Sequence, residues 1–355
     1  MHPHVRSPFI GRASLLVVLG AIAGPAASAP LYHLVDLGAD TAANDINRHG
    51  VVAGSRQGHA AMRRADGWHA RAGADSVRAL DGQGEATGLG LTPDRVYYSV
   101  YWAAGGGSAV PVTMPFNAVQ VLALDVESGR VAGYAEDDTF RAHCFVWTPA
   151  GGGVDLGTGA RGNYCYAYDI NESGQLVGST LPPEPFAQEQ GFIWQDGVFT
   201  FLGTLPGGHW SEANAINRQG HVAMTADRLL ANGQGAWRPV LWTGTRLKDL
   251  GTIDRSRQAQ ALHINDRDEV VGEYWTADLG WRPFLYSEGQ LYPIESLVDN
   301  LGAVDIGIPR AIADDGTIVG TFIDEQRVTH AYRLERVATS GASDASAGSG
   351  NESVR

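Results

Sequence analysis

The segment Ala167-Tyr168-Asp169-Ile170-Asn171-Glu172-Ser173-Gly174-Gln175-Leu176-Val177-Gly178 decides the fold, because a close copy follows at Ala213-Asn214-Ala215-Ile216-Asn217-Arg218-Gln219-Gly220-His221-Val222-Ala223. In both copies Asn-x-x-Gly stands between two short apolar runs. This is a turn signal, since Asn suits the first corner of a turn and Gly takes positive φ without strain. The repeated segment therefore predicts a β-hairpin.

Further copies of this hairpin occur along most of the chain. Their turns centre on Asn47, Val126, Asn265 and Ala313, and a faint copy centres on Leu91, with Asp94 and Val96. Successive centres lie 35 to 48 residues apart, a period typical of four-stranded propeller blades. Helical solenoids have similar periods, but apolar residues here alternate and turns recur about every ten residues, which favours strands. After Asn265, Asp268 replaces the glycine, and Asp tolerates the left-handed conformation better than most residues.

A second repeated block supplies further strands of each unit. It reads polar, small, aromatic, apolar, aromatic, as in His143-Cys144-Phe145-Val146-Trp147, with counterparts at 190–194, 238–242, 282–286 and 330–334. Several copies are followed by a turn and a short block such as Val154-Asp155-Leu156-Gly157. The hairpin and these two blocks make four strands. We therefore expect an all-β protein, a β-propeller of about seven (six to eight) four-stranded blades.

The two ends of the repeat region complement each other. Val35-Asp36-Leu37-Gly38 belongs after an aromatic strand that the start of the region lacks, and the block from His330 to Leu334 has nothing after it. Together they make one unit, so we expect the N- and C-terminal strands to pair, which closes the ring and leaves no open sheet edge. A single repeat domain is expected over residues 30–337.

Residues 1–29 have the pattern of a secretory signal peptide. Arg6 and Arg12 give a basic start, residues 13–23 are apolar, and Ala27-Ser28-Ala29 offers small residues for cleavage. The protein is thus expected in the periplasm or outside the cell. No later apolar run reaches membrane-spanning length. Residues 338–355 are rich in Ser, Gly and Ala without apolar periodicity, which predicts a disordered tail.

Charge and cysteine content bear on partners and compartment. The formal charge of −13 becomes −15 once the two signal arginines are removed, so nucleic acid is a poor partner. Cys144 and Cys165 are the only cysteines. In an oxidising compartment they are expected to form one disulfide, worth about 3 kcal/mol for a loop of about 22 residues. Two buried free thiols are the alternative.

Two places on the loops are candidates for ligand binding. His209 and Trp210 follow Leu205-Pro206-Gly207-Gly208, where the repeat requires no aromatic residue, so they suit stacking on a ligand or packing on the surface. Asp137 and Asp138 belong to an acidic cluster in a predicted turn. They could bind a ligand, serve as acid and base, or simply form the turn.

No catalytic residue is assigned, since the sequence has no Gly-x-Ser-x-Gly, His-Glu-x-x-His or Gly-Lys-Ser/Thr motif. Three histidines share one repeat position at which Gln190, Arg238 and Arg282 stand in other copies, and they are His59, His143 and His330. They are interpreted as structural residues rather than metal ligands. Neither a metal site nor a cofactor is expected.

The ordered blocks His143-Cys144-Phe145 and His330-Ala331-Tyr332, with the Asp-Leu-Gly-Thr and Ala-x-x-Ile-Asn-x-x-Gly segments around them, resemble the HAF family of extracellular repeat proteins. The resemblance covers roughly Leu31 to Leu334. It implies a secreted bacterial repeat protein with a propeller-like fold and no established general activity, and it carries over no catalytic residue. The chain departs from the pattern between Glu85 and Ala118, where the aromatic block is blurred.

These observations favour a monomeric, non-catalytic binding module that uses loops at one face of a propeller to contact a protein or a glycan at the cell envelope. One alternative is a hydrolase or lyase acting on an extracellular polysaccharide, which requires convergent carboxylates, one of them with a raised pKa. Another is a purely structural surface protein.

Overall fold

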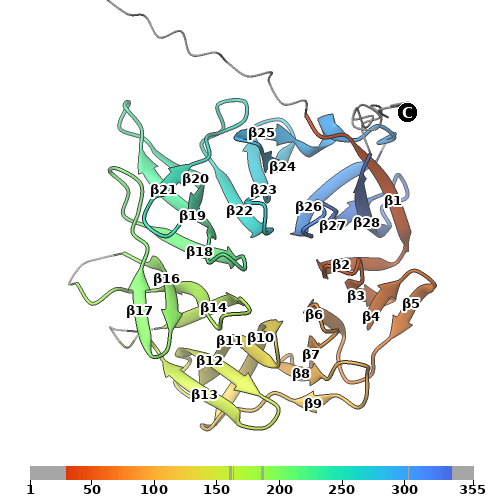
Figure 1. Cartoon of the computed structure of the whole chain (residues 1–355), viewed down its shortest axis with the longest axis vertical. Coiled ribbons are helices and arrows are strands. Elements are labelled where there is room, and N and C mark those ends of the chain that lie inside the picture. The colour runs from red at the N-terminus through yellow and green to blue at the C-terminus, as the bar shows by residue number, and fades with distance from the viewer. Residues whose placement is uncertain (1–28, 160–161, 163, 185–187, 303, 338–355) are drawn as a thin grey trace, which may run out of the picture.

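The computed structural model describes residues 29–159, 162, 164–184, 188–302 and 304–337. The predicted signal peptide, apart from its last residue, and the predicted tail lie outside the described residues. Seen down its axis, the described chain forms a ring of blades (Figure 1). The space at its centre, which we call the channel, holds cavities lined by residues of the innermost strands. It comprises seven four-stranded antiparallel sheets, which confirms the predicted propeller.

The blades follow one another along the chain, and the first strand named for each lines the channel. Blade 1 is β2 (Thr41–Ile46), β3 (Val52–Arg56), β4 (His59–Arg64) and β5 (Gly67–Ala70). Blade 2 is β6 (Ser76–Leu80), β7 (Ala86–Leu91), β8 (Tyr97–Trp102) and β9 (Val110–Pro111). Blade 3 is β10 (Ala118–Glu127), β11 (Arg130–Asp137), β12 (Ala142–Thr148) and β13 (Gly152–Gly157). Blade 4 is β14 (Cys165–Ile170), β15 (Leu176–Thr180), β16 (Gln190–Gln195) and β17 (Val198–Phe201).

The remaining blades repeat this order. Blade 5 is β18 (Ser211–Ile216), β19 (Val222–Leu229), β20 (Gly235–Trp242) and β21 (Leu247–Asp249). Blade 6 is β22 (Ala259–Ile264), β23 (Val270–Thr276), β24 (Gly280–Ser287) and β25 (Gln290–Pro293), followed by a short 3-10 helix, η1 (Ile294–Leu297). Blade 7 is β26 (Asp305–Ile312), β27 (Ile318–Ile323), β28 (Thr329–Arg336) and β1 (Tyr32–Ala39). Within the described ranges, no helix has the length and apolar character needed to cross a membrane.

The seventh blade closes the ring. β1 pairs antiparallel with β28, so that Tyr32 stands opposite Arg336 and Ala39 opposite His330. Just beyond the strands, the amide of Val337 donates to the carbonyl of Leu31 at 2.8 Å. The predicted pairing of the N- and C-terminal strands is confirmed, and the outer edge of β28 is covered.

The predicted hairpin turn has a buried asparagine at its first corner. The side-chain oxygen of Asn171 accepts hydrogen bonds from the amides of Ser173 and Gln175 at 3.1 and 3.0 Å. Its Nδ2 donates to the carbonyl of Asn217 in the next blade at 3.1 Å. Equivalent inter-blade bonds run from Asn47 to Asp81, from Asn217 to Asn265 and from Asn265 to Ala313. The motif therefore joins blades as well as forming turns.

The two glycines of the motif are required for different reasons. Gly174 has φ of 76°, and in the copy without glycine Asp268 takes φ of 59°, as predicted. Gly178 is required for space, because a Cβ there would lie 1.9 Å from the carbonyl oxygen of Tyr166. The register of β14 and β15 shifts just beside this point, which brings that carbonyl close.

The predicted faint hairpin at Leu91 is wrong. Leu91 is the last residue of β7, and the turn after it, in which the amide of Arg95 donates to Thr92, joins β7 to β8. The first hairpin of blade 2 turns at Asp81, ten residues earlier. The Oδ1 atom of Asp81 accepts the amides at positions 83 and 85, both at 2.8 Å. An aspartate followed by glycine replaces the usual asparagine there, so the copy escapes a search for Asn-x-x-Gly.

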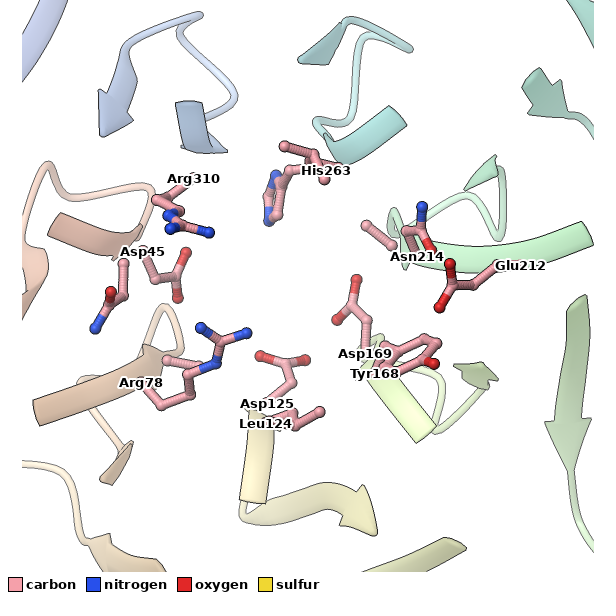
Figure 2. A pocket seen from close by; sticks show the side chains of 14 residues that line it. Asp45, Arg78, Leu124, Asp125, Tyr168, Asp169, Glu212, Asn214, His263 and Arg310 are labelled. Carbon is pink, nitrogen blue, oxygen red and sulfur yellow. The ribbon is translucent and has the colours of Figure 1, made fainter. Parts of the chain in front are cut away.

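Three aspartates on the innermost strands point into the channel (Figure 2). Each accepts a hydrogen bond from a main-chain amide of the next blade. The donors are the amides of Leu80 to Asp45 at 2.9 Å, Ile170 to Asp125 at 3.0 Å and Ile216 to Asp169 at 2.7 Å. Burial raises the pKa of Asp125 well above its usual range, and the charge of Asp169 raises it further. Burial raises the pKa of Asp169 as well, and a hydrogen bond between these two carboxyl groups links blade 3 to blade 4.

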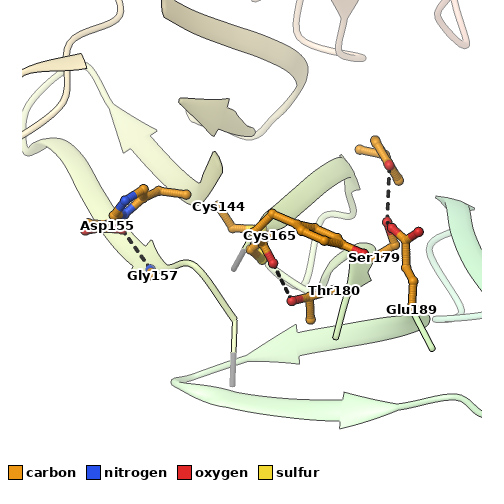
Figure 3. The surroundings of a disulfide bond; sticks show 10 residues. Cys144, Asp155, Gly157, Cys165, Ser179, Thr180 and Glu189 are labelled. Carbon is orange, nitrogen blue, oxygen red and sulfur yellow. Dashed lines mark hydrogen bonds and ion pairs between the residues drawn. A yellow bond between two sulfur atoms is a disulfide. The ribbon is translucent and has the colours of Figure 1, made fainter. Parts of the chain in front are cut away.

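The predicted disulfide is present (Figure 3). Cys144 on β12 and Cys165 on β14 are bonded, with Cα atoms 5.1 Å apart. Both cysteines are fully buried in an apolar cluster that includes Ala132, Leu176 and Phe192. The bond thus links blade 3 to blade 4.

The apolar core lies between neighbouring blades. One cluster packs Ala223 and Leu241 of blade 5 against Tyr274 and Phe284 of blade 6. Because each blade buries one face on the next, a blade cannot hide its apolar residues alone. The strands are consequently rigid, and the segments that connect them are free to differ from blade to blade.

Candidate functional site

Connecting segments differ most at one end of the ring, which we call the loop end. It carries the turns between the second and third strands of each blade and the connections from one blade to the next. The opposite end carries the asparagine turns, and we call it the turn end. All four residues predicted to bind a ligand lie at the loop end, two in blade 3 and two between blades 4 and 5.

Asp137 is occupied by its own turn. Its Oδ1 atom accepts hydrogen bonds from the amide and hydroxyl of Thr139, at 2.8 and 2.7 Å, and from the amide of Arg141 at 3.0 Å. These hydrogen bonds lower the pKa of Asp137 below its usual range, and the one from the amide of Arg141 has the largest effect. Asp137 therefore stays ionised and forms the turn, and its neighbour Asp138 is exposed.

His209 and Trp210 are held by one carboxylate. The amides of both residues donate to Oδ1 of Asp227 at 2.7 Å. The indole nitrogen of Trp210 donates to Glu189 at 3.1 Å, and its ring lies 5.8 Å from that of Trp237. The imidazole of His209 is exposed. The structure therefore places Trp210 in an aromatic group, whereas no contact joins this pair to Asp137 or Asp138 within the described residues.

A cleft of about 860 Å³ opens beside this aromatic group, between blades 5 and 6. Its floor is the segment from Asp254 to Gln258, which connects β21 to β22. The amide of Trp237, on β20, donates to the carbonyl of Arg257 at 2.8 Å, and the amide of Trp275, on β23, donates to that of Gln258 at 2.8 Å. The same short segment thus positions both tryptophans.

Both tryptophans of the cleft are exposed to solvent. Trp237 is 42% exposed and Trp275 is 43% exposed. Each has a second tryptophan behind it, since Trp210 lies 5.8 Å from Trp237 and Trp281 lies 5.6 Å from Trp275. Four of the nine tryptophans of the chain therefore gather at this cleft.

Charged residues and strained backbone complete the floor of the cleft. Asp254 and Arg255 are exposed and take φ of 51° and 57°, a conformation that costs energy in residues other than glycine. Below them, Nη1 of the buried Arg238 donates to the carbonyls of Trp237 and Ser256, both at 3.1 Å. Two donor bonds from one planar guanidinium fix the floor to the wall.

Sequence reasoning identified Trp210 but missed Trp237 and Trp275. Trp237 directly precedes the repeated block at 238–242, and Trp275 follows the Val-Val-Gly of its hairpin. The available signal was the one that identified Trp210, namely an aromatic residue at a place that the repeat does not require. Only the ring brings the two tryptophans together, since they come from different blades.

The predicted structural role of the repeated histidine fits what surrounds it. Nδ1 of His143 lies 3.0 Å from Asp155 and Nε2 lies 3.3 Å from Asp137. His330 is placed in the same way, 2.9 Å from Asp36 and 3.2 Å from Asp324. In the part of the chain that the structure describes, no group of three or more His, Cys, Asp or Glu residues is arranged to hold a metal ion.

Comparisons with known proteins show the fold. No family model and no curated protein matches the sequence. The β-propeller domain of the Trilobed protease from Pyrococcus furiosus is similar in structure, with a TM-score of 0.57 and 10% identity over 87% of this chain and 95% of that chain. Pyrococcus horikoshii acylaminoacyl peptidase has a TM-score of 0.52 and 13% identity, covering 86% of this chain and 52% of that chain. The first is described as having an open velcro topology, whereas here β1 pairs with β28.

Proposed function

We propose that this protein is a secreted, non-catalytic binding module whose cleft between blades 5 and 6 takes a glycan chain. The single observation that carries the proposal is the pair of half-exposed tryptophans, Trp237 and Trp275, positioned by one connecting segment. Exposed aromatic surface of this kind marks a binding site more often than an accident of packing.

The chemistry of the cleft suits a sugar chain better than a protein. The face of an indole ring carries a negative quadrupole, which attracts the weakly positive C–H face of a sugar ring. Around the tryptophans stand exposed groups that can bind hydroxyls, among them Asp254, Arg257 and Asp278. A protein partner would need about 800 Å² of contact surface with an apolar centre, and charged residues interrupt the apolar area here.

The cleft is also rigid before any ligand arrives. Its walls are propeller strands, and its floor is tied to both walls by main-chain hydrogen bonds and by Arg238. A preformed site loses less conformational entropy on binding, so modest contacts yield measurable affinity.

We propose that the protein binds the glycan without cleaving it. Cleavage would need a carboxyl group with a raised pKa at the loop end, and the pKa of Asp137 is lowered. In the channel, burial raises the pKa of Asp125, Asp169 and Glu212, but each already has a hydrogen-bond partner within the protein, namely the amides of Ile170 and Ile216 and the hydroxyl of Tyr168. These hydrogen bonds give the three carboxyl groups a structural use.

The secreted location rests on three supports. They are the predicted signal peptide, the resemblance to HAF repeats, and the disulfide between Cys144 and Cys165, which persists in oxidising compartments. We place the protein in the periplasm or outside the cell.

The test uses the purified protein in affinity electrophoresis against soluble β-glucan, arabinoxylan, alginate and solubilised peptidoglycan. We expect at least one polymer to retard the protein, and Trp237→Ala and Trp275→Ala each to weaken that binding about tenfold or more. Phe140→Ala is the matched control, because Phe140 is 77% exposed at the loop end but beside Asp137 and Asp138. No retardation by any polymer, or equal losses in the control, would overturn the proposal.

A further inference from the structure

Two arginines in the channel lack partners. Arg78 on β6 and Arg310 on β26 line a cavity of about 260 Å³, and Figure 2 shows both guanidinium groups turned toward its centre. Neither side chain makes a hydrogen bond or an ion pair with any of the residues described. Burial lowers the pKa of Arg78 and the charge of Arg310 lowers it further, whereas the nearby charges of Asp45 and Asp125 offset part of this fall. Two cations that face one confined space without a direct ion pair favour an anionic group between them.

Acidic residues line the opposite side of the same cavity. Asp169 comes from β14 and Glu212 from β18, and both line the cavity with Tyr168. Burial raises the pKa of Glu212, and its hydrogen bond with Tyr168 offsets part of this rise. Asp45 of blade 1 and Asp125 of blade 3 also line the cavity, on the side of the arginines (Figure 2). The cavity thus presents both signs of charge, and Asp169 and Glu212 stand on the side away from the arginines.

Ion pairs cross the turn end of the channel above this cavity. Arg48 of blade 1 lies 3.5 Å from Glu172 of blade 4. Arg218 of blade 5 lies 3.9 Å from Glu172, and it also pairs with Asp266 and Asp314 of the next two blades. This network lies at the turn end of the channel, where the pocket that it lines shares Asp45, Asp125, Asp169 and His263 with the cavity.

We infer that the channel binds a small zwitterion that carries a carboxylate and a protonated amine, as an amino acid or a short peptide does. Its carboxylate pairs with Arg78 and Arg310, since the planar fork of guanidinium matches a carboxylate. Its ammonium faces Asp169 and Glu212. A bare anion would leave Asp169 and Glu212 unmatched, and a bare cation would leave the arginines unmatched, so a dipolar ligand complements the cavity best.

The size of the cavity limits the ligand. At about 260 Å³ it lies below the usual range for drug-sized ligands, which leaves room for a free amino acid or a dipeptide. The site shares no residue with the cleft that holds Trp237 and Trp275. It is therefore independent of the proposed glycan binding, and either can fail without the other.

The first experiment is calorimetric titration of the purified protein with each of the twenty amino acids and with Ala-Ala. The tightest ligand is then compared with its N-acetyl derivative, which lacks the amine charge, and its amide, which lacks the carboxylate. We expect both derivatives to bind at least tenfold more weakly than the zwitterion. The inference is overturned if nothing in the panel binds, or if the N-acetyl derivative binds as tightly as the parent.

Substitutions then assign the two halves of the cavity. Arg78→Met and Arg310→Met should each weaken binding at least tenfold and leave the urea midpoint unchanged or raised, because the cations are unpaired in the empty protein. Glu212→Gln, which keeps the contact with Tyr168, should weaken binding of the zwitterion but leave binding of its N-acetyl derivative unchanged. Arg56→Gln, an exposed arginine outside the channel, is the control and should change nothing. Unchanged binding in both methionine variants would contradict the site.

Discussion

At the scale of single residues, the buried asparagine of each hairpin uses both ends of its amide. The oxygen of Asn171 closes its own turn, and Nδ2 reaches the carbonyl of Asn217 in the next blade. The sequence predicted the turn from Asn-x-x-Gly, because turn chemistry is local. It could not predict the second bond, because the partner lies 46 residues away and is brought close only by the ring.

Asn171→Ala should lower the free energy of unfolding by about 2–3 kcal/mol, since it leaves buried amide and carbonyl groups without partners. Asn171→Asp keeps the acceptor and loses the donor, as Asp81 does naturally, so its loss should be smaller. Urea denaturation measures both. The control is Asn232→Ala, because Asn232 is exposed and caps only its own turn through Gln234, so it should cost less than about 1 kcal/mol. Equal losses at positions 171 and 232 would show that the inter-blade bond adds nothing.

At the scale of elements, the Asp-Leu-Gly block and the block that begins with the repeated histidine look independent in the sequence but contact each other in the structure. The aspartate of the Asp-Leu-Gly block accepts a hydrogen bond from the amide of the glycine in the same block, at 2.8 Å for Gly38 and Asp36 and at 2.7 Å for Gly157 and Asp155. The same aspartates lie beside the repeated histidines, His330 and His143 respectively. The sequence grouped the histidines by their shared repeat position, and two of the three, His143 and His330, lie beside such an aspartate. Their partner could not be assigned without the pairing of the third and fourth strands.

His330 should make ring closure depend on pH, because it connects β28 to Asp36 of β1. Burial opposes protonation of His330, but hydrogen bonds and charges from Asp36 and Asp324 outweigh it and raise its pKa. The stabilisation of the fold by charged His330 is therefore complete below about pH 6.5, the ordinary pKa of histidine, and is lost as the pH rises through the raised pKa of His330. His330→Gln should lower the melting temperature by about 2–4 °C at pH 5.5 and have little effect at pH 9.

Thermal melts between pH 5.5 and 9 measure this difference. His59→Gln is the matched control, because His59 holds the same repeat position in blade 1, is exposed, and makes no side-chain hydrogen bond within the described chain. It should leave the profile unchanged. A constant difference between wild type and His330→Gln over the whole range would rule out the charged contact.

At the scale of the whole molecule, the sequence predicted the architecture but not the site. The number of blades, the strand count and the closure followed from the period and from the order of blocks at the two ends. The cleft did not follow, since Trp237 and Trp275 lie 38 residues apart and meet only because blades 5 and 6 are neighbours with a shared connecting segment. Repeat positions reveal what every blade needs, whereas a binding site depends on what one pair of blades does differently.

The closure predicts how the chain tolerates new ends. The start of β1 lies beside the end of β28, since Tyr32 stands opposite Arg336 and Val337 bonds to Leu31. A circular permutant that joins Val337 to Leu31 through a short glycine-containing turn and begins at Thr41 would make every blade continuous in sequence. It should fold, with an unfolding free energy within about 2 kcal/mol of the parent, because loop closure costs little over such lengths. Deleting residues 30–39 instead should yield unfolded or aggregated protein, since it removes the buried Tyr32 and Leu37 and exposes the edge of β28. Size-exclusion chromatography and urea denaturation distinguish the two variants, and a stable monomer from the deletion would show that the ring does not depend on its last strand.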